Sequence, residues 1–271
     1  MFRLELDLYS FADLRRTRAL ARVGRAFDED PSLRLERIDV REPVRNAVAS
    51  AEAYLADAAH FLANGDILFE RRRDPNLNGE ISAPSYRDDE PPGTAHRLHS
   101  DTGDADEAWF HEPANLKAFG RLFARLAGGF DAFYGFAADH QMARQQAGEF
   151  VRTRMAKRFA PAAPGPESDL HSVRDVYWLN YFGPAYVEMW AERLRGLGVR
   201  QEPTTNGGVV IWATDTPFVF DETIGSFTEY PWKKPFHEAL GLETFVNALK
   251  TSWDRRVPAR ADHILHVESE N

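Results

Sequence analysis

The chain has 271 residues, of which 43% are hydrophobic and 12% aromatic, so it can bury a large core and its composition excludes a disordered chain. Its formal net charge of −9 excludes the basic surface of a general nucleic-acid binder, and it suits a basic protein partner. Cysteine is absent, which excludes disulfides, thiolate metal sites and a cysteine nucleophile.

The first part of the chain predicts strands and helices in alternation. Residues 2–9 alternate apolar and charged side chains, which is the period of a half-buried strand. Ser10 is expected to cap a following arginine-rich helix, and residues 33–38 resemble a second strand. Residues 46–65 place apolar side chains at helical spacing and end in glycine, and residues 66–69 predict another strand.

The middle of the chain predicts a long loop and then helices. Residues 71–106 are polar and rich in proline and glycine, interrupted by a short strand near residues 94–99. A loop of this length in a compact domain is functional or mobile. Residues 116–130 carry an apolar stripe at steps of three and four, which predicts a helix. Residues 131–138 are compatible with a strand or a turn, and residues 140–157 are expected to be helical.

The block VYWLNYF, residues 176–182, predicts a central strand, because it is apolar on both faces. Strict alternation would place Trp178 and Phe182 on the same face. Asn180 is the polar exception, and a buried amide must form hydrogen bonds. The Gly-Pro pair that follows is expected to begin a helix, and we expect Trp178 and Trp190 to be buried.

The rest of the C-terminal part predicts a hairpin and one more helix. Asn206-Gly207 is a hairpin turn before a strand over residues 209–214, and residues 218–220 are expected to extend the sheet. A last helix is expected over residues 236–249. These elements predict an α+β fold, with a mixed or antiparallel sheet flanked by helices.

The domain organisation has two interpretations. Residues 160–169 have the proline-rich composition of a linker. The chain therefore forms either a single domain over residues 1–271, or two lobes, 1–159 and 173–271, joined by the Pro-rich stretch 160–172.

No motif assigns a chemistry to the chain. The P-loop, dinucleotide-binding, zinc-protease and α/β-hydrolase signatures are all missing, so no catalytic residue and no cofactor is assigned. His96, His99, Asp101 and His111 have the ligand types of a zinc or iron site in a metal-dependent hydrolase. An extended strand would point His96 and His99 to opposite faces, which favours two histidines in a polar segment without a metal.

An acidic segment is the candidate partner-binding site. Asp101, Asp104, Asp106 and Glu107 lie close together, next to Trp109. A cluster of charges is most often a solvated loop. Acidic groups beside an aromatic anchor are also the composition of a surface that docks a basic partner. These five residues are the site that the sequence predicts for a protein partner.

One family resemblance bears on function. The run DVYWLNYFGPAYVEMW, followed by NGGVVIWATDTPFVFD, resembles bacterial immunity proteins of contact-dependent and type VI secretion toxin systems, over roughly residues 175–245. The resemblance implies an α+β fold, no enzymatic activity, and neutralisation of a cognate toxin by binding. It transfers no contact residues, because no shared binding motif accompanies it.

The resemblance yields the main functional hypothesis, a cytoplasmic immunity protein that binds a toxin with a basic surface. The N-terminus carries Arg3, Glu5 and Asp7 in place of the apolar run of a signal peptide, and no apolar stretch is long enough for a membrane span. We therefore expect no membrane or nucleic-acid partner. A metal-dependent hydrolase and a scaffold or assembly module are the alternatives, and the oligomeric state stays open.

Overall fold

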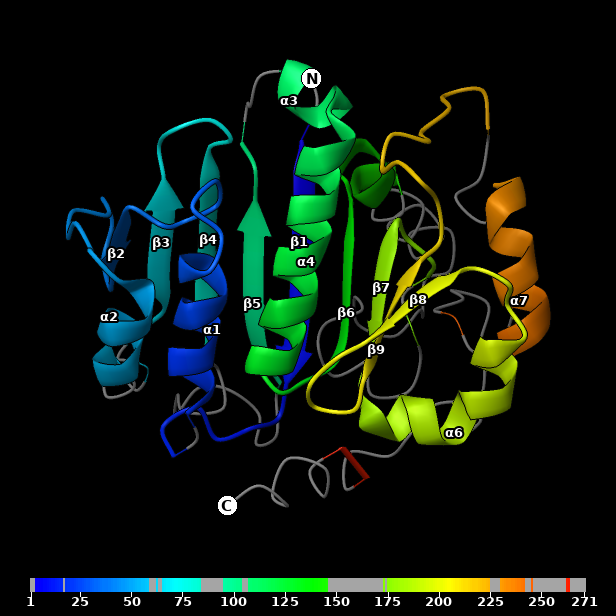
Figure 1. The fold of residues 1–271 in the computed structure, drawn as a ribbon, viewed down its shortest axis with the longest axis horizontal. Coiled ribbons are helices and arrows are strands. Elements are labelled where there is room, and N and C mark those ends of the chain that lie inside the picture. Colours follow the sequence, from blue (N-terminus) through cyan, green and yellow to red (C-terminus); the bar gives the residue numbers. More distant parts are fainter. Residues whose placement is uncertain are drawn as a thin grey trace, which may run out of the picture.

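The computed structural model describes residues 3–16, 18–58, 62, 65–83, 95–103, 107–145, 173, 175–224, 230–241, 245 and 262–263. The fold is α+β, as predicted, and is built on one nine-stranded sheet with the order β2-β3-β4-β5-β1-β6-β7-β9-β8 (Figure 1). The pairings between these strands are all antiparallel. The strands are β1 (Leu4–Ser10), β2 (Arg37–Asp39), β3 (Ile67–Arg71), β4 (Leu77–Ser82), β5 (His96–Asp101), β6 (Ala132–Asp139), β7 (Leu179–Phe182), β8 (Arg200–Pro203) and β9 (Val209–Trp212).

The helices pack on the sheet in two groups. One group covers one face of the sheet along β2 to β6: α1 (Ala19–Asp28), α2 (Ala51–Asp57) and α4 (Pro113–Gly129), with the short α3 (Glu107–His111) leading into α4 (Figure 1). The other group contributes to a second apolar cluster with β6 and β7: α6 (Pro184–Arg195) and α7 (Lys234–Leu240), the latter preceded by the 3-10 turn η5 (Pro231–Lys233). No described helix has the length and apolar character needed to cross a bilayer.

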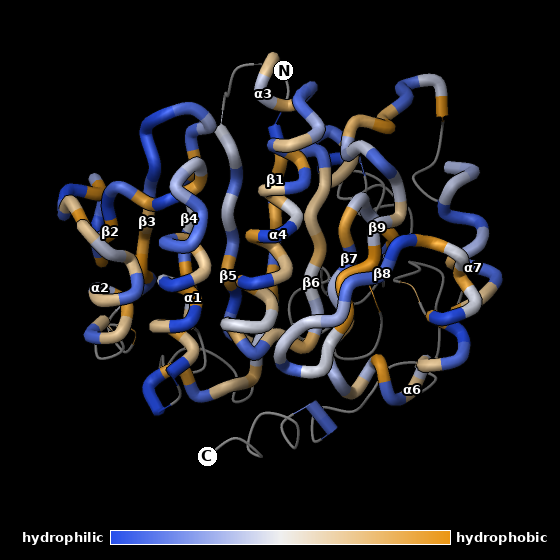
Figure 2. The backbone as a smooth tube through the Cα atoms, in the orientation of Figure 1, coloured by the Kyte–Doolittle hydropathy of each residue, from blue (hydrophilic) through white to orange (hydrophobic). Residues whose placement is uncertain are grey.

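The alternation of β1 places its leucines on one face and its charged side chains on the other, although six of its seven residues are buried. Leu4, Leu6 and Leu8 are buried in the cluster beneath α4. Glu5 and Asp7 project from the opposite face, as the sequence predicted for residues 2–9. Farther across the sheet both faces become apolar, and Figure 2 shows hydrophobic stretches along β7 and β9.

The corner between β7 and α6 is buried, as predicted. β7 lies between β6 and β9, and Trp178 and Trp190 are 2% and 3% exposed. The Asn180 side chain accepts a hydrogen bond from the Tyr177 N–H (2.9 Å) and donates one to the Tyr177 carbonyl (2.8 Å), which satisfies the buried amide. Trp178 packs in the cluster on the α4 side and Phe182 in the other, contrary to the expected alternation. The strand begins only at Leu179, so alternation does not extend back to residue 178.

The N-terminal part differs from prediction at two places. Ser10 does not cap a helix, because α1 begins only at Ala19; its hydroxyl donates to the Asp131 carbonyl and accepts from the Ala12 N–H. Part of the predicted loop is β4, which is a strand because it pairs with β3 on one side and β5 on the other. The helix expected from residue 46 is limited to α2, with Ser50 at its N-cap.

The C-terminal part also departs from prediction. Residues 218–220 form no strand and do not extend the sheet. The last predicted helix ends at Leu240, where Gly241 takes a positive φ of 84°, and residues 246–249 lie outside the described structure. Of the helix expected over residues 140–157, residues 140–145 are helical and the others are not described.

The sheet passes directly from the N-terminal to the C-terminal part of the chain. β6 pairs with β7 although the undescribed segment 160–172 separates them in sequence. Just before β7, the buried Asp175 accepts from the Lys233 ammonium (3.2 Å) and lies 3.2 Å from His237 Nε2. This buried ion pair ties the start of α7 to the central strands.

Candidate functional site

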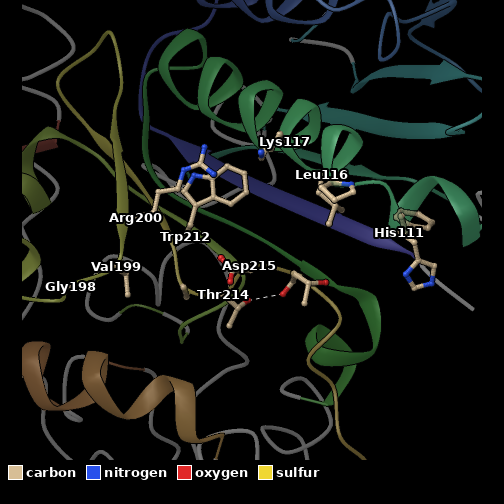
Figure 3. A pocket seen from close by; sticks show the side chains of 13 residues that line it. His111, Leu116, Lys117, Gly198, Val199, Arg200, Trp212, Thr214 and Asp215 are labelled. Atoms are coloured by element: carbon tan, nitrogen blue, oxygen red, sulfur yellow. Dashed lines mark hydrogen bonds between the residues drawn. The ribbon is translucent and has the colours of Figure 1, made fainter.

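A cleft of about 620 Å³ is the candidate functional site (Figure 3). Three segments that are distant in sequence line it: residues 110–117 from α3 and α4, residues 198–200 at the start of β8, and residues 212–216 after β9. The first segment immediately follows the acidic segment that the sequence predicts as a partner-binding site. A cleft of this volume is within the range of ligand and side-chain binding sites.

Trp212 forms the floor of the cleft. It is 7% exposed and lies edge-on to Trp178, with ring centroids 5.6 Å apart. A Cβ atom on residue 120 would overlap the six-membered ring of Trp212, so the close approach of α4 to this end of the sheet requires Gly120. The buried indole N–H of Trp212 has no hydrogen-bond partner among the described residues.

Arg200 covers the indole from the edge strand β8. Its guanidinium carbon lies 4.1 Å from the ring centroid of Trp212, a cation–π geometry. The same guanidinium forms an ion pair with Glu202, two residues further along β8 and therefore on the same face of the strand. These two contacts hold the Arg200 side chain at the mouth of the cleft.

Two exposed charges complete the cleft. Lys117 lies on the helical side and Asp215 on the side of the segment that follows β9 (Figure 3). Neither forms an ion pair within the described residues. Beside Asp215, the Thr214 hydroxyl donates to the Thr216 carbonyl (2.7 Å), which shapes this wall. The cleft therefore combines an apolar floor with accessible charges, and its chemistry suits binding.

Of the five residues predicted for partner binding, the structure describes the side chains of Asp101 and Trp109. The Asp101 carboxylate accepts from Arg3 Nη2 and from the Gly103 N–H, both at 2.8 Å. Trp109 is half-buried on α3, edge-on to Phe110, which lines the cleft. Asp104 and Asp106 lie outside the described residues, as does the side chain of Glu107. Partner binding by these residues therefore stays a prediction.

The structure does not bring the predicted metal-ligand set together. On β5, His96 points with Leu98 to the buried face covered by helices, and His99 points to the opposite face. His111 lies on α3. Within the described residues no three histidine or carboxylate side chains are grouped closely enough to hold a metal ion. The alternation of a strand, which the sequence analysis weighed against this site, is the physical reason.

His99 instead belongs to a charged network on the polar face of the sheet. Its Nδ1 lies 3.0 Å from Asp7 Oδ1, and Arg97 Nε donates to the same oxygen at 2.7 Å. Burial raises the pKa of Asp7, but the hydrogen bond with His99 and the charge of Arg97 outweigh it and hold that pKa below its usual value. Burial lowers the pKa of His99, and the contact with Asp7 raises it overall above its usual value.

Asp139, at the end of β6, is a second perturbed carboxyl. Burial raises its pKa to about 6, and the hydrogen bond that it accepts from the Gln141 N–H offsets this only in part. It lies opposite Leu4 of the neighbouring strand β1. This group titrates near neutral pH, but it belongs to the sheet and not to the cleft.

The comparisons with known proteins establish the fold alone. No protein-family model matches the chain, and no curated protein matches it. A solved structure described as "Pseudomonas aeruginosa T6SS protein PA0821" is similar, with a TM-score of 0.52 and 14% sequence identity. The similarity covers 98% of this chain and 81% of that chain. The two proteins therefore share a fold over nearly the whole length of this chain.

Sequence reasoning missed the main residues of the cleft. Lys117, Arg200 and Trp212 come from α4, β8 and β9, and no local pattern links them. The Asn206-Gly207 turn was the available signal, because a hairpin turn before β9 requires a strand on its other side. The structure provides that strand as β8, the edge of the sheet.

Proposed function

We propose that this chain is a non-enzymatic immunity protein of a type VI secretion toxin system, which binds and neutralises a cognate toxin. The observation that carries the proposal is the similarity of fold, over 98% of the chain, to a type VI secretion system protein. The sequence block that resembles immunity proteins supports it independently. That block forms β7, α6 and β9, which are part of the shared fold.

The surface chemistry supports binding as the activity. The described cleft offers an apolar floor with exposed charges, and its lining residue Phe110 directly follows Trp109 of the acidic segment in sequence. The charged network on the sheet face is internally paired, Asp7 with Arg97 and His99, and Asp101 with Arg3. Lys117 and Asp215 form no ion pair among the described residues, so both can meet charges of a partner, as expected for an interface that selects its partner by charge.

Co-expression with the product of the neighbouring open reading frame tests the proposal. We expect that product to arrest growth of a host cell alone and to be tolerated when this chain is present. We also expect the two purified proteins to form a complex of defined mass by light scattering. A neighbouring product that is harmless, or whose toxicity this chain leaves unchanged, would contradict the proposal.

Charge reversal tests the acidic segment as the docking surface. Asp104→Lys with Asp106→Lys should slow association with the toxin about tenfold at low salt, because electrostatic attraction acts mainly on the association rate. The matched control is Asp57→Lys with Glu192→Lys, two exposed positions on α2 and α6 that give the same change in net charge. Equal association rates for both double variants would remove the acidic segment from the interface.

A further inference from the structure

We infer that the cleft binds a carboxylate side chain of the toxin, with Lys117 and Arg200 as the cations that receive it. The inference rests on the proposed function and specifies what this part of the interface recognises. The acidic segment would meet the basic surface of the toxin, and the cleft would meet an acidic residue of the toxin.

The cleft presents basic side chains on a chain that is acidic overall. The chain carries 42 acidic and 33 basic residues. Among the described side chains that line the cleft, Lys117 and Arg200 are basic and Asp215 is acidic. A uniformly basic partner would be repelled at this point, whereas a carboxylate would be attracted. Local complementarity of this kind fixes register and excludes wrong partners.

Lys117 differs from the other cations on its helix. Lys117, Arg121 and Arg125 follow one another at steps of four on α4 and so share a face. Arg121 lies 3.9 Å from the Asp30 carboxylate, and Arg125 lies 3.3 Å from that of Glu29. Lys117 is exposed and forms no ion pair within the described residues. It is therefore the cation of this row that an external carboxylate can neutralise.

Arg200 is held in place before any partner arrives. Its stacking on Trp212 and its ion pair with Glu202 favour this placement of the half-exposed guanidinium over the cleft. A guanidinium has five N–H donors, so donors remain for a second carboxylate. Because the side chain is already ordered, binding to it loses less conformational entropy.

The packing disfavours a nucleotide base as the occupant. Aromatic recognition of a base requires an open ring face, and Trp212 is 7% exposed with Arg200 on it. Phe110 and Leu116 also line the cleft but are 1% and 8% exposed, so the accessible groups of the cleft are its charged side chains. The observations therefore favour a protein segment with an acidic residue.

The test compares Lys117→Glu and Lys117→Gln with the matched control Lys234→Glu, an exposed lysine on α7 outside the cleft. Dissociation constants for the purified toxin are measured by isothermal titration calorimetry. We expect Lys117→Glu to weaken binding at least about tenfold, Lys117→Gln to weaken it less, and Lys234→Glu to stay within about twofold. Urea midpoints equal to wild type would establish that the variants are folded.

The two proposals fail differently. If the wild-type chain binds no toxin, the proposed function fails. If the wild type binds and Lys117→Glu binds equally well, the toxin docks elsewhere and the inference about the cleft is overturned. If an Asp→Lys or Glu→Lys variant of the toxin restores binding to Lys117→Glu, the carboxylate is identified and the inference is supported directly.

Discussion

The six-membered ring of Trp212 occupies the space that a side chain on residue 120 would require. Gly120 is in the middle of α4, where glycine costs about 1 kcal/mol relative to alanine. The chain tolerates that cost because the indole packs directly on the helix backbone. The contact fixes the helical wall of the cleft to its floor.

Gly120→Ala should therefore destabilise the protein by about 1–3 kcal/mol, because overpacking against Trp212 exceeds the gain in helix propensity. Urea denaturation measures the free energy of unfolding. Gly196→Ala is the matched control: its added methyl would meet its nearest atom at 3.5 Å, an ordinary contact. A Gly120→Ala variant more stable than wild type would show that α4 and Trp212 do not pack as described.

Trp190→Ala should lower the free energy of unfolding by about 3–5 kcal/mol, because it empties a large volume beneath α6. Trp190 lies edge-on to Phe182 and 5.0 Å from the ring centre of Tyr186. Met189→Ala, at the 40%-exposed neighbouring position, should change stability by less than about 0.5 kcal/mol. Unchanged stability with lost toxin binding would instead make Trp190 a contact residue.

His99→Gln should reduce stability by about 1–3 kcal/mol near pH 6, because it removes a charged hydrogen bond to the buried Asp7. The raised pKa of His99 means that this stabilisation is complete below about pH 6.5 and is lost as the pH rises through the folded-state value. The difference from wild type should therefore shrink toward pH 9. A difference between His99→Gln and wild type that stays constant from pH 6 to pH 9 would contradict the raised pKa.

Asp139→Asn tests the second perturbed carboxyl. With a folded-state pKa of about 6 and an unfolded value near 3.8, the wild type loses stability as the pH rises from about 4 through 6. Asparagine keeps an acceptor for the Gln141 N–H but does not ionise. In urea denaturation, the free energy of unfolding of the variant should rise relative to that of wild type between pH 4 and pH 7. Parallel pH profiles for the two proteins would refute the raised pKa.

Local patterns predicted those elements whose periodicity comes from burial. The alternation in residues 2–9, the stripe of α4 and the Gly183-Pro184 start of α6 all reflect one face turned to the core. β4 escaped prediction because its residues are polar on one face and its pairing partners come from elsewhere in the chain. Ser10 was misassigned because its hydroxyl partner, the Asp131 carbonyl, is 121 positions away.

The sequence predicted less of the cleft than of the fold. The acidic segment was visible as a run of charges, whereas the cleft is assembled by the adjacency of β8 and β9 to α4. The exposed Lys117 becomes distinctive only when the partners of Arg121 and Arg125 are known. These contacts join residues that are far apart in the chain, so no local sequence pattern shows them.

The direct pairing of β6 with β7 has a consequence for dividing the chain. The register runs from Tyr134–Phe182 to Ala137–Leu179, so each half of the molecule contributes one strand to the same central ladder. Residues 1–159 or 173–271 alone would each expose the strand edge that this ladder covers, a template for aggregation. Expressed together, the two pieces should recombine into a functional split protein, with protection against the toxin reporting their association.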